Sequence, residues 1–124
     1  MKIYDLLHHT SGIPEFLAGF RENWKSNKIA TNADLVQYYA QREDTLEFTP
    51  NTRHDYCNTN YALLATIIER VSGQDLDGYL SAQIFKPLKM DRTFIYNRRL
   101  APRDISNYAT GYVWVPNSFE KATT

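Results

Sequence analysis

The chain has 124 residues, 43% of them hydrophobic, and its 14 lysines and arginines are balanced by 14 aspartates and glutamates. The balanced charge argues against a protein that binds nucleic acid or a membrane surface through basic residues. The apolar runs are too short to span a bilayer, and a single cysteine cannot form a disulfide within the chain. The length suits a single domain, which as a compact fold would expose about 6,800 Å² of surface.

Helices are expected through much of the N-terminal half. Apolar side chains at helical spacing mark residues 1–9 and 15–24, and Gly12 separates the two because glycine suits the left-handed position after a helix. A further helix is expected to begin at Thr31 or Asn32, since either side chain can accept a hydrogen bond from the first turn.

The strongest helical pattern covers residues 59–72 and ends before Gly73, a residue suited to a helix C-terminus. Its apolar side chains cover about 200° of the helical wheel, so we expect burial on more than one side. They are Tyr61, Leu63, Leu64, Ala65, Ile67, Ile68 and Val71.

The C-terminal third is predicted to hold less regular structure. Asp75 can cap one more helix, which Pro87 stops. Aromatic and β-branched residues favour short strands at 93–96 and 108–115. Residues 117–124 are polar and are expected to form an unstructured tail after a single domain over residues 1–116.

Two local motifs could carry nucleophilic chemistry. His54 lies three residues before Cys57, which allows a cysteine–histidine pair. A small buried thiol beside a helix start explains Cys57 better, because no third group orients the histidine. Ser118 and Lys121 match Ser-x-x-Lys, but such a short match arises readily by chance.

Tyr56 and Asn58 flank Cys57 just before the strongest helix. Local chemistry gives them a structural interpretation, in which Asn58 caps the helix and Tyr56 packs near its start. A catalytic interpretation needs more than these residues, because a tyrosine is a poor base at its ordinary pKa of about 10.

Several stretches follow one another in the order of a known family. They are Leu-Leu-His-His-Thr-Ser-Gly-Ile-Pro at 6–14, Phe-Thr-Pro-Asn at 48–51, Tyr-Cys-Asn-Thr-Asn-Tyr-Ala-Leu-Leu at 56–64, Ile-Ile-Glu-Arg-Val-Ser-Gly at 67–73, a Pro-Leu-Lys-Met segment within 84–93, and Ala-Thr-Gly-Tyr at 109–112. Together they resemble the serine β-lactamase-like superfamily, which includes class C β-lactamases, penicillin-binding DD-peptidases and related esterases.

The resemblance implies roles for Tyr56 and Asn58. In the family, the Tyr-x-Asn element supplies a general-base tyrosine and an asparagine that hydrogen-bonds the substrate. The reaction passes through an acyl-enzyme formed on a β-lactam, a D-Ala-D-Ala peptide or an ester, and no metal or organic cofactor is implied. Cys57 stands where the family usually has serine, and Asn51 where it usually has glycine; asparagine tolerates the left-handed backbone that this turn requires.

The resemblance also implies what lies outside this sequence. The family's nucleophilic Ser-x-x-Lys should precede residue 1, and its Lys-Thr-Gly or His-x-Gly strand should follow residue 124. We therefore expect a mainly α chain, the helical domain inserted in the family's α/β fold, with a little β near the C-terminus. Alone, it should be an inactive fragment.

The expected partners follow from that interpretation. They are the α/β domain of a longer protein and, through an exposed apolar face, a second copy of the chain; nucleic acid and membrane insertion are not expected. The family's members are usually exported, which is compatible with a periplasmic or other extracytoplasmic location. The alternative is a non-catalytic helical binding module derived from this family.

Overall fold

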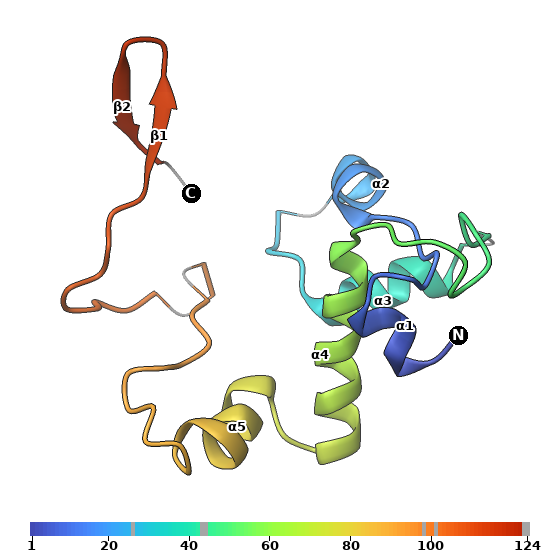
Figure 1. Ribbon diagram of the computed structural model, residues 1–124, viewed down its shortest axis with the longest axis horizontal. Helices are drawn as coiled ribbons and strands as arrows, with labels where there is room; N and C mark the ends of the chain where they lie inside the picture. Colours follow the sequence, from blue (N-terminus) through green and yellow to red (C-terminus); the bar gives the residue numbers. More distant parts are fainter. Residues whose placement is uncertain (26, 43–44, 98, 101, 123–124) are drawn as a thin grey trace.

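A computed structural model describes residues 1–25, 27–42, 45–97, 99–100 and 102–122. Its elements, in chain order, are α1 (Ile3–Leu7), α2 (Phe16–Asn23), α3 (Asn32–Ala40), α4 (Asn58–Ser72), α5 (Leu76–Leu80), a π-helical turn η1 (Ser81–Phe85), β1 (Tyr112–Val115) and β2 (Ser118–Lys121). Helices α1, α2 and α3 all contact α4, and α5 packs at its C-terminal end (Figure 1).

The helix boundaries follow the capping residues. Thr31 Oγ1 accepts the amide of Asp34 at 3.3 Å, and Asp34 Oδ2 accepts the amide of Thr31 at 2.8 Å, which starts α3. Gly73 ends α4 with a φ of 70°. Asp75 Oδ1 accepts the amide of Gly78 at 2.7 Å at the start of α5. These sequence-based predictions are confirmed.

The C-terminal hairpin differs from its prediction. β1 and β2 pair antiparallel, so the strand expected over 108–115 is confirmed only from Tyr112 onward. Residues 118–121, expected in an unstructured tail, form the second strand. The ring centroids of Trp114 and Phe119 lie 4.8 Å apart across the two strands, and such a cross-strand pair stabilises the hairpin. The pattern of residues 118–121 alone did not predict this strand.

The expectation of a mainly α chain is wrong. Most described residues lie outside helices, and the helix expected after Asp75 gives way to a π-helical turn at Ser81. Residues 93–96, expected as a strand, are an irregular segment instead, in which the amide of Ile95 donates to Asp77 Oδ1 at 2.8 Å. The chain is therefore a short helical cluster followed by a long, largely irregular segment and a two-stranded sheet.

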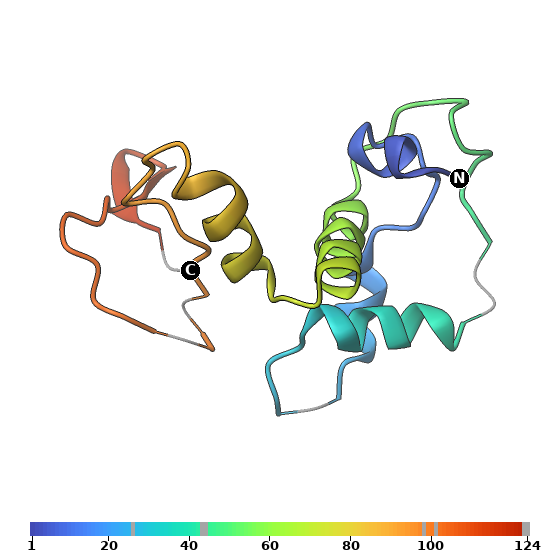
Figure 2. The same cartoon turned by 90° about the horizontal axis from the view of Figure 1, so that it is seen from below.

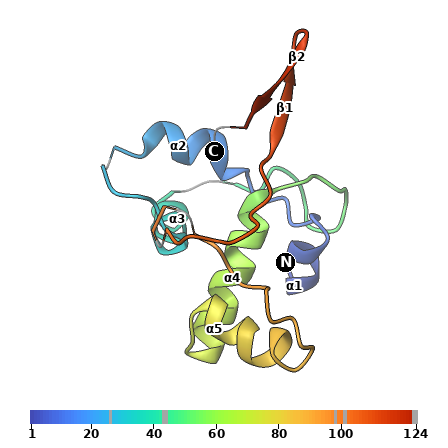
Figure 3. The same cartoon turned by 90° about the vertical axis from the view of Figure 1, so that its left-hand side faces the viewer.

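The exposed surface is far larger than a compact fold of this length requires. It measures 9807 Å², against the expected value of about 6,800 Å². Figures 2 and 3 show the cause, because the described residues of 86–97, 99–100 and 102–122 extend away from the helices around α4, and the hairpin projects from the rest. Large exposed apolar residues there include Leu88, Leu100, Tyr108, Trp114 and Phe119.

The buried side of α4 is polar rather than apolar. Its buried residues are Thr59, Asn60 and Thr66, whereas its apolar side chains are half-buried or exposed, up to 84% at Val71. The prediction of an apolar helix buried on several sides is therefore wrong, because the short helices α1, α2 and α3 cover only part of it. No helix within the described ranges is long and apolar enough to cross a membrane.

Gly12 allows two distant segments to cross. Its φ is 75°, and a Cβ atom on it would lie 2.2 Å from the carbonyl oxygen of Phe48. The amide of Glu47 donates to the Gly12 carbonyl at 2.8 Å, which holds the segments in this close approach. Glycine is needed here both for the backbone conformation and for the space.

A pair of alanine substitutions separates these two requirements. Gly73 has a similar φ of 70° but no atom within 4 Å of the added Cβ, so Gly73→Ala should cost only the conformational term of about 1–2 kcal/mol. Gly12→Ala must also relieve the overlap with Phe48, and we expect roughly twice that loss or more. Urea unfolding of both variants measures the difference; equal losses would show that the crossing is absent.

Candidate functional site

A buried polar junction joins residues 9–15 to residues 57–60 at the N-terminal end of α4. Its central bond runs from Ser11 Oγ to Asn60 Oδ1 at 2.6 Å, and the amide of Ile13 donates back to Ser11 Oγ at 3.1 Å. Ser11 is 1% exposed and Asn60 is fully buried. Buried polar groups without partners are costly, so these bonds fix where the loop meets the helix.

The carbonyl oxygen of Pro14 is the second anchor of the junction. It accepts a hydrogen bond from Thr59 Oγ1 at 2.8 Å and another from the Tyr39 hydroxyl at 2.9 Å. Thr59 Oγ1 in turn accepts the amide of Phe16 at 3.0 Å. Burial raises the pKa of Tyr39 above its ordinary value, so its phenol keeps its proton, and can donate, to a higher pH than an exposed tyrosine.

Cys57 belongs to this junction as a buried thiol. Its Sγ donates to the carbonyl of Ile13 at 3.2 Å, and its amide donates to His9 Nδ1 at 3.2 Å. His54 packs instead against the ring of His9, with centroids 5.9 Å apart. The structure therefore does not bring Cys57 and His54 together as a nucleophile and base.

Tyr56 and Asn58 lie together at the exposed edge of the junction. Tyr56 is 65% exposed, and its hydroxyl donates to Asn58 Oδ1 at 3.2 Å. Asn58 does not cap α4: the N-cap residue is Cys57, which makes no side-chain cap bond. Glu15 supplies the acceptor instead, since its Oε2 lies 2.6 Å from the Asn58 amide and 3.0 Å from Asn58 Nδ2.

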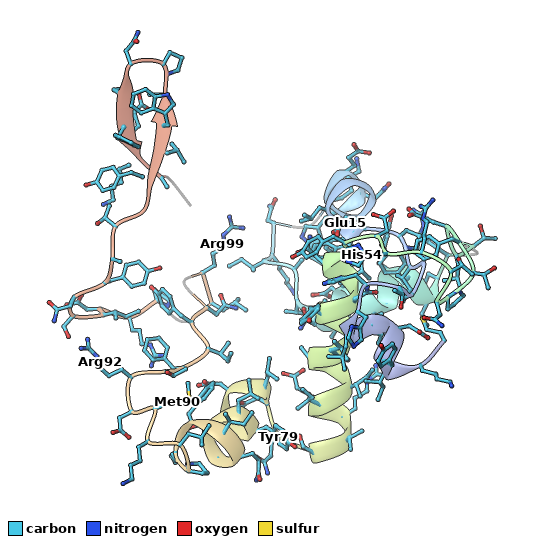
Figure 4. The ribbon with its side chains drawn as sticks, in the orientation of Figure 1. Glu15, His54, Tyr79, Met90, Arg92 and Arg99 are labelled. Atoms are coloured by element: carbon cyan, nitrogen blue, oxygen red, sulfur yellow. The ribbon has the colours of Figure 1, made fainter. Side chains whose placement is uncertain are left out.

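Two residues at this site were missed from the sequence. His9 has a φ of 54°, and its ring packs 4.5 Å from that of Tyr56 and 5.2 Å from that of Tyr61. Glu15 looked only like the start of a helix, although Figure 4 places it, with His54, near the N-terminal end of α4. Both contacts join residues more than 40 positions apart, which no local pattern reports.

Ser118 and Lys121 do not form a catalytic pair. Both are exposed residues of strand β2, and side chains three positions apart on a strand point to opposite faces. On a helix the same spacing would bring them together. Within the described residues there is also no cluster of three histidine, cysteine, aspartate or glutamate side chains that could hold a metal ion.

Comparison with known proteins supports the family resemblance that the order of motifs suggested. The sequence model of the Beta-lactamase family matches residues 1–121. The chain is 45% identical over 112 residues to "Penicillin-binding protein 4*" of Bacillus subtilis (strain 168), covering 90% of this chain and 25% of the relative. It is 31% identical to a "Putative D-alanyl-D-alanine carboxypeptidase" of Escherichia coli (strain K12), covering 94% and 29%. It thus spans about a quarter of these relatives' length.

Solved structures agree over nearly the whole chain. A D-amino acid amidase from Ochrobactrum anthropi SV3 matches with a TM-score of 0.70 and 27% identity, over 97% of this chain and 33% of the amidase. An octameric penicillin-binding protein homologue from Pyrococcus abyssi matches with a TM-score of 0.70 and 27% identity, over 98% and 28%. These matches cover the irregular segments and the hairpin as well as the helices.

The reactivity of Cys57 tests its structural role. At 4% exposure, with its thiol bonded to backbone carbonyls, Cys57 should react with iodoacetamide much more slowly in the folded chain than in concentrated urea. His54→Ala should leave the native rate unchanged. Fast native labelling that disappears in His54→Ala would restore the cysteine–histidine pair.

Proposed function

This chain belongs to the beta-lactamase family of serine hydrolases, and from that premise we propose that it contributes Tyr56 and Asn58 to the catalytic centre of such an enzyme. Tyr56 is the proton-transfer residue, and Asn58 hydrogen-bonds the substrate. The single observation that carries this assignment is the 3.2 Å bond between the two side chains at an exposed edge, next to segments locked by buried bonds. Groups held in advance lower the barrier most effectively.

The proposed reaction divides its parts between this chain and the rest of a longer protein. A serine of a Ser-x-x-Lys element attacks the substrate carbonyl, and Tyr56, acting as phenolate, accepts the serine proton. Tyr56 then passes this proton to the leaving nitrogen as the carbonyl–nitrogen bond breaks, which leaves the acyl-enzyme. Water then releases the acyl group. Because 65% of Tyr56 is exposed, its oxygen is accessible to groups from another part of the protein.

The relatives favour one substrate class within the family. The names of two of them specify D-alanyl-D-alanine and D-amino acid amides as substrates. We therefore propose a peptide or amide carbonyl next to a D-residue as the substrate, ahead of a simple ester. The amide of Asn58 suits such a substrate, since it can both accept and donate hydrogen bonds.

The extended surface supports the proposed partners. The exposed area of 9807 Å² and the exposed apolar residues of 86–122 would be covered by an α/β domain that completes the fold. Without that domain, the same surface would drive copies of this chain to associate. One structural neighbour is described as octameric, which is compatible with association.

Acylation by a fluorescent penicillin tests the proposed function. The 124-residue chain should form no adduct by intact-mass spectrometry, because Ser118 and Lys121, which match Ser-x-x-Lys, lie on a strand that points their side chains to opposite faces. A longer form that includes the family's Ser-x-x-Lys and Lys-Thr-Gly elements should form a stoichiometric adduct. There, Tyr56→Phe should slow acylation by about 10²–10⁴-fold.

Tyr61→Phe is the matched control. Tyr61 is also exposed and also lies beside His9, but its hydroxyl donates to the carbonyl of Leu7 at 3.3 Å rather than to Asn58. Its loss should change the acylation rate little. An adduct on the 124-residue chain that Ser118→Ala abolishes would overturn the proposal, and a longer form that folds without being acylated would favour the non-catalytic binding module.

A further inference from the structure

The carboxylate of Glu15 occupies the N-terminal end of α4. Its Oε2 accepts both the backbone amide of Asn58 at 2.6 Å and the side-chain Nδ2 at 3.0 Å, while Oε1 accepts the amide of Leu17 at 3.1 Å. The carboxylate of Glu15 thus accepts hydrogen bonds from three donors at the N-terminal end of a 15-residue helix. The contact joins α4 to a residue 43 positions earlier.

This contact decides which way the side-chain amide of Asn58 faces. An ionised carboxylate can only accept hydrogen bonds, so the amide must turn Nδ2 toward Glu15 and its Oδ1 away. The oxygen then faces the hydroxyl of Tyr56, which donates to it at 3.2 Å. Turning the amide over would set two oxygens against each other on the Glu15 side and lose the bond from Tyr56.

We infer that Glu15 is a positioning residue that fixes the side-chain amide of Asn58, with Nδ2 held by the carboxylate and Oδ1 held by Tyr56. The inference deepens the proposed function and rests on it for its catalytic meaning. One Nδ2 hydrogen and one Oδ1 lone pair remain free. They complement the C=O and the N–H of a substrate amide, so Glu15 sets the geometry in which a peptide-like substrate is recognised.

The orientation can be measured in the 124-residue chain without a substrate. In NMR spectra of the 15N-labelled chain, an Nδ2 proton of Asn58 should exchange about tenfold more slowly than those of Asn117, which lies in the exposed hairpin turn. Contacts from the Nδ2 protons should reach the Glu15 side chain rather than the ring of Tyr56. Glu15→Ala should abolish both the protection and the contacts.

Two further variants separate orientation from stability. Asp34→Ala removes a carboxylate from the start of α3, far along the chain from Asn58, and should leave the Asn58 protons protected even where it destabilises the chain. Glu15→Gln keeps the shape and a neutral acceptor, so it should preserve the fold and retain part of the protection. If Glu15→Ala unfolds the chain, these two variants still test the role of Glu15.

The outcomes distinguish this inference from the proposed function. Asn58 protons that exchange as fast as those of Asn117 in the unmodified chain, or that stay protected in a folded Glu15→Ala variant, would overturn the role of Glu15. A fixed amide together with unchanged acylation of a longer form carrying Asn58→Ala would leave the role of Glu15 intact and refute the proposed function instead.

Discussion

The hydrogen bond between Ser11 and Asn60 is the contact on which the rest of the N-terminal half depends. Its two side chains are almost completely buried, so water cannot replace either of them as a hydrogen-bond partner. A buried polar group that loses its partner costs about 1–3 kcal/mol, and hydrogen bonds are directional, whereas apolar contacts tolerate sliding. This bond therefore sets the register between the loop at residues 9–15 and the first turn of α4.

That register determines where the candidate catalytic residues stand. Tyr56 and Asn58 lie on either side of Cys57, whose amide and thiol are both bonded to the loop. Glu15 leaves the same loop and reaches the start of α4. Tyr56, which is exposed, and Asn58, which is half-buried, are thus held in place both through the buried residue between them and by the opposite segment. Rigid support beneath accessible groups is what a binding site requires.

The sequence predicted what local chemistry controls. Thr31, Gly73 and Asp75 marked helix boundaries correctly because caps act within one turn. The fold class was wrong. Residues 118–121 were assigned to a tail although they pair with residues 112–115 across a two-residue turn, and most of the described residues lie outside helices. The order of motifs, and not periodicity, identified Tyr56 and Asn58 as candidates. Only the three-dimensional structure reveals the contacts of Glu15 and His9 and the polar buried side of α4.

A double-mutant cycle on Ser11 and Asn60 tests the central claim most directly. Unfolding free energies are measured in urea for the unmodified chain, Ser11→Ala, Asn60→Ala and the double variant. If the bond holds the junction, each single variant leaves one buried polar group unpaired. The double variant should then lose less unfolding free energy than the two single variants together, which gives a coupling energy of about 1 kcal/mol or more. Strictly additive losses would show that the two side chains act independently and would contradict the account.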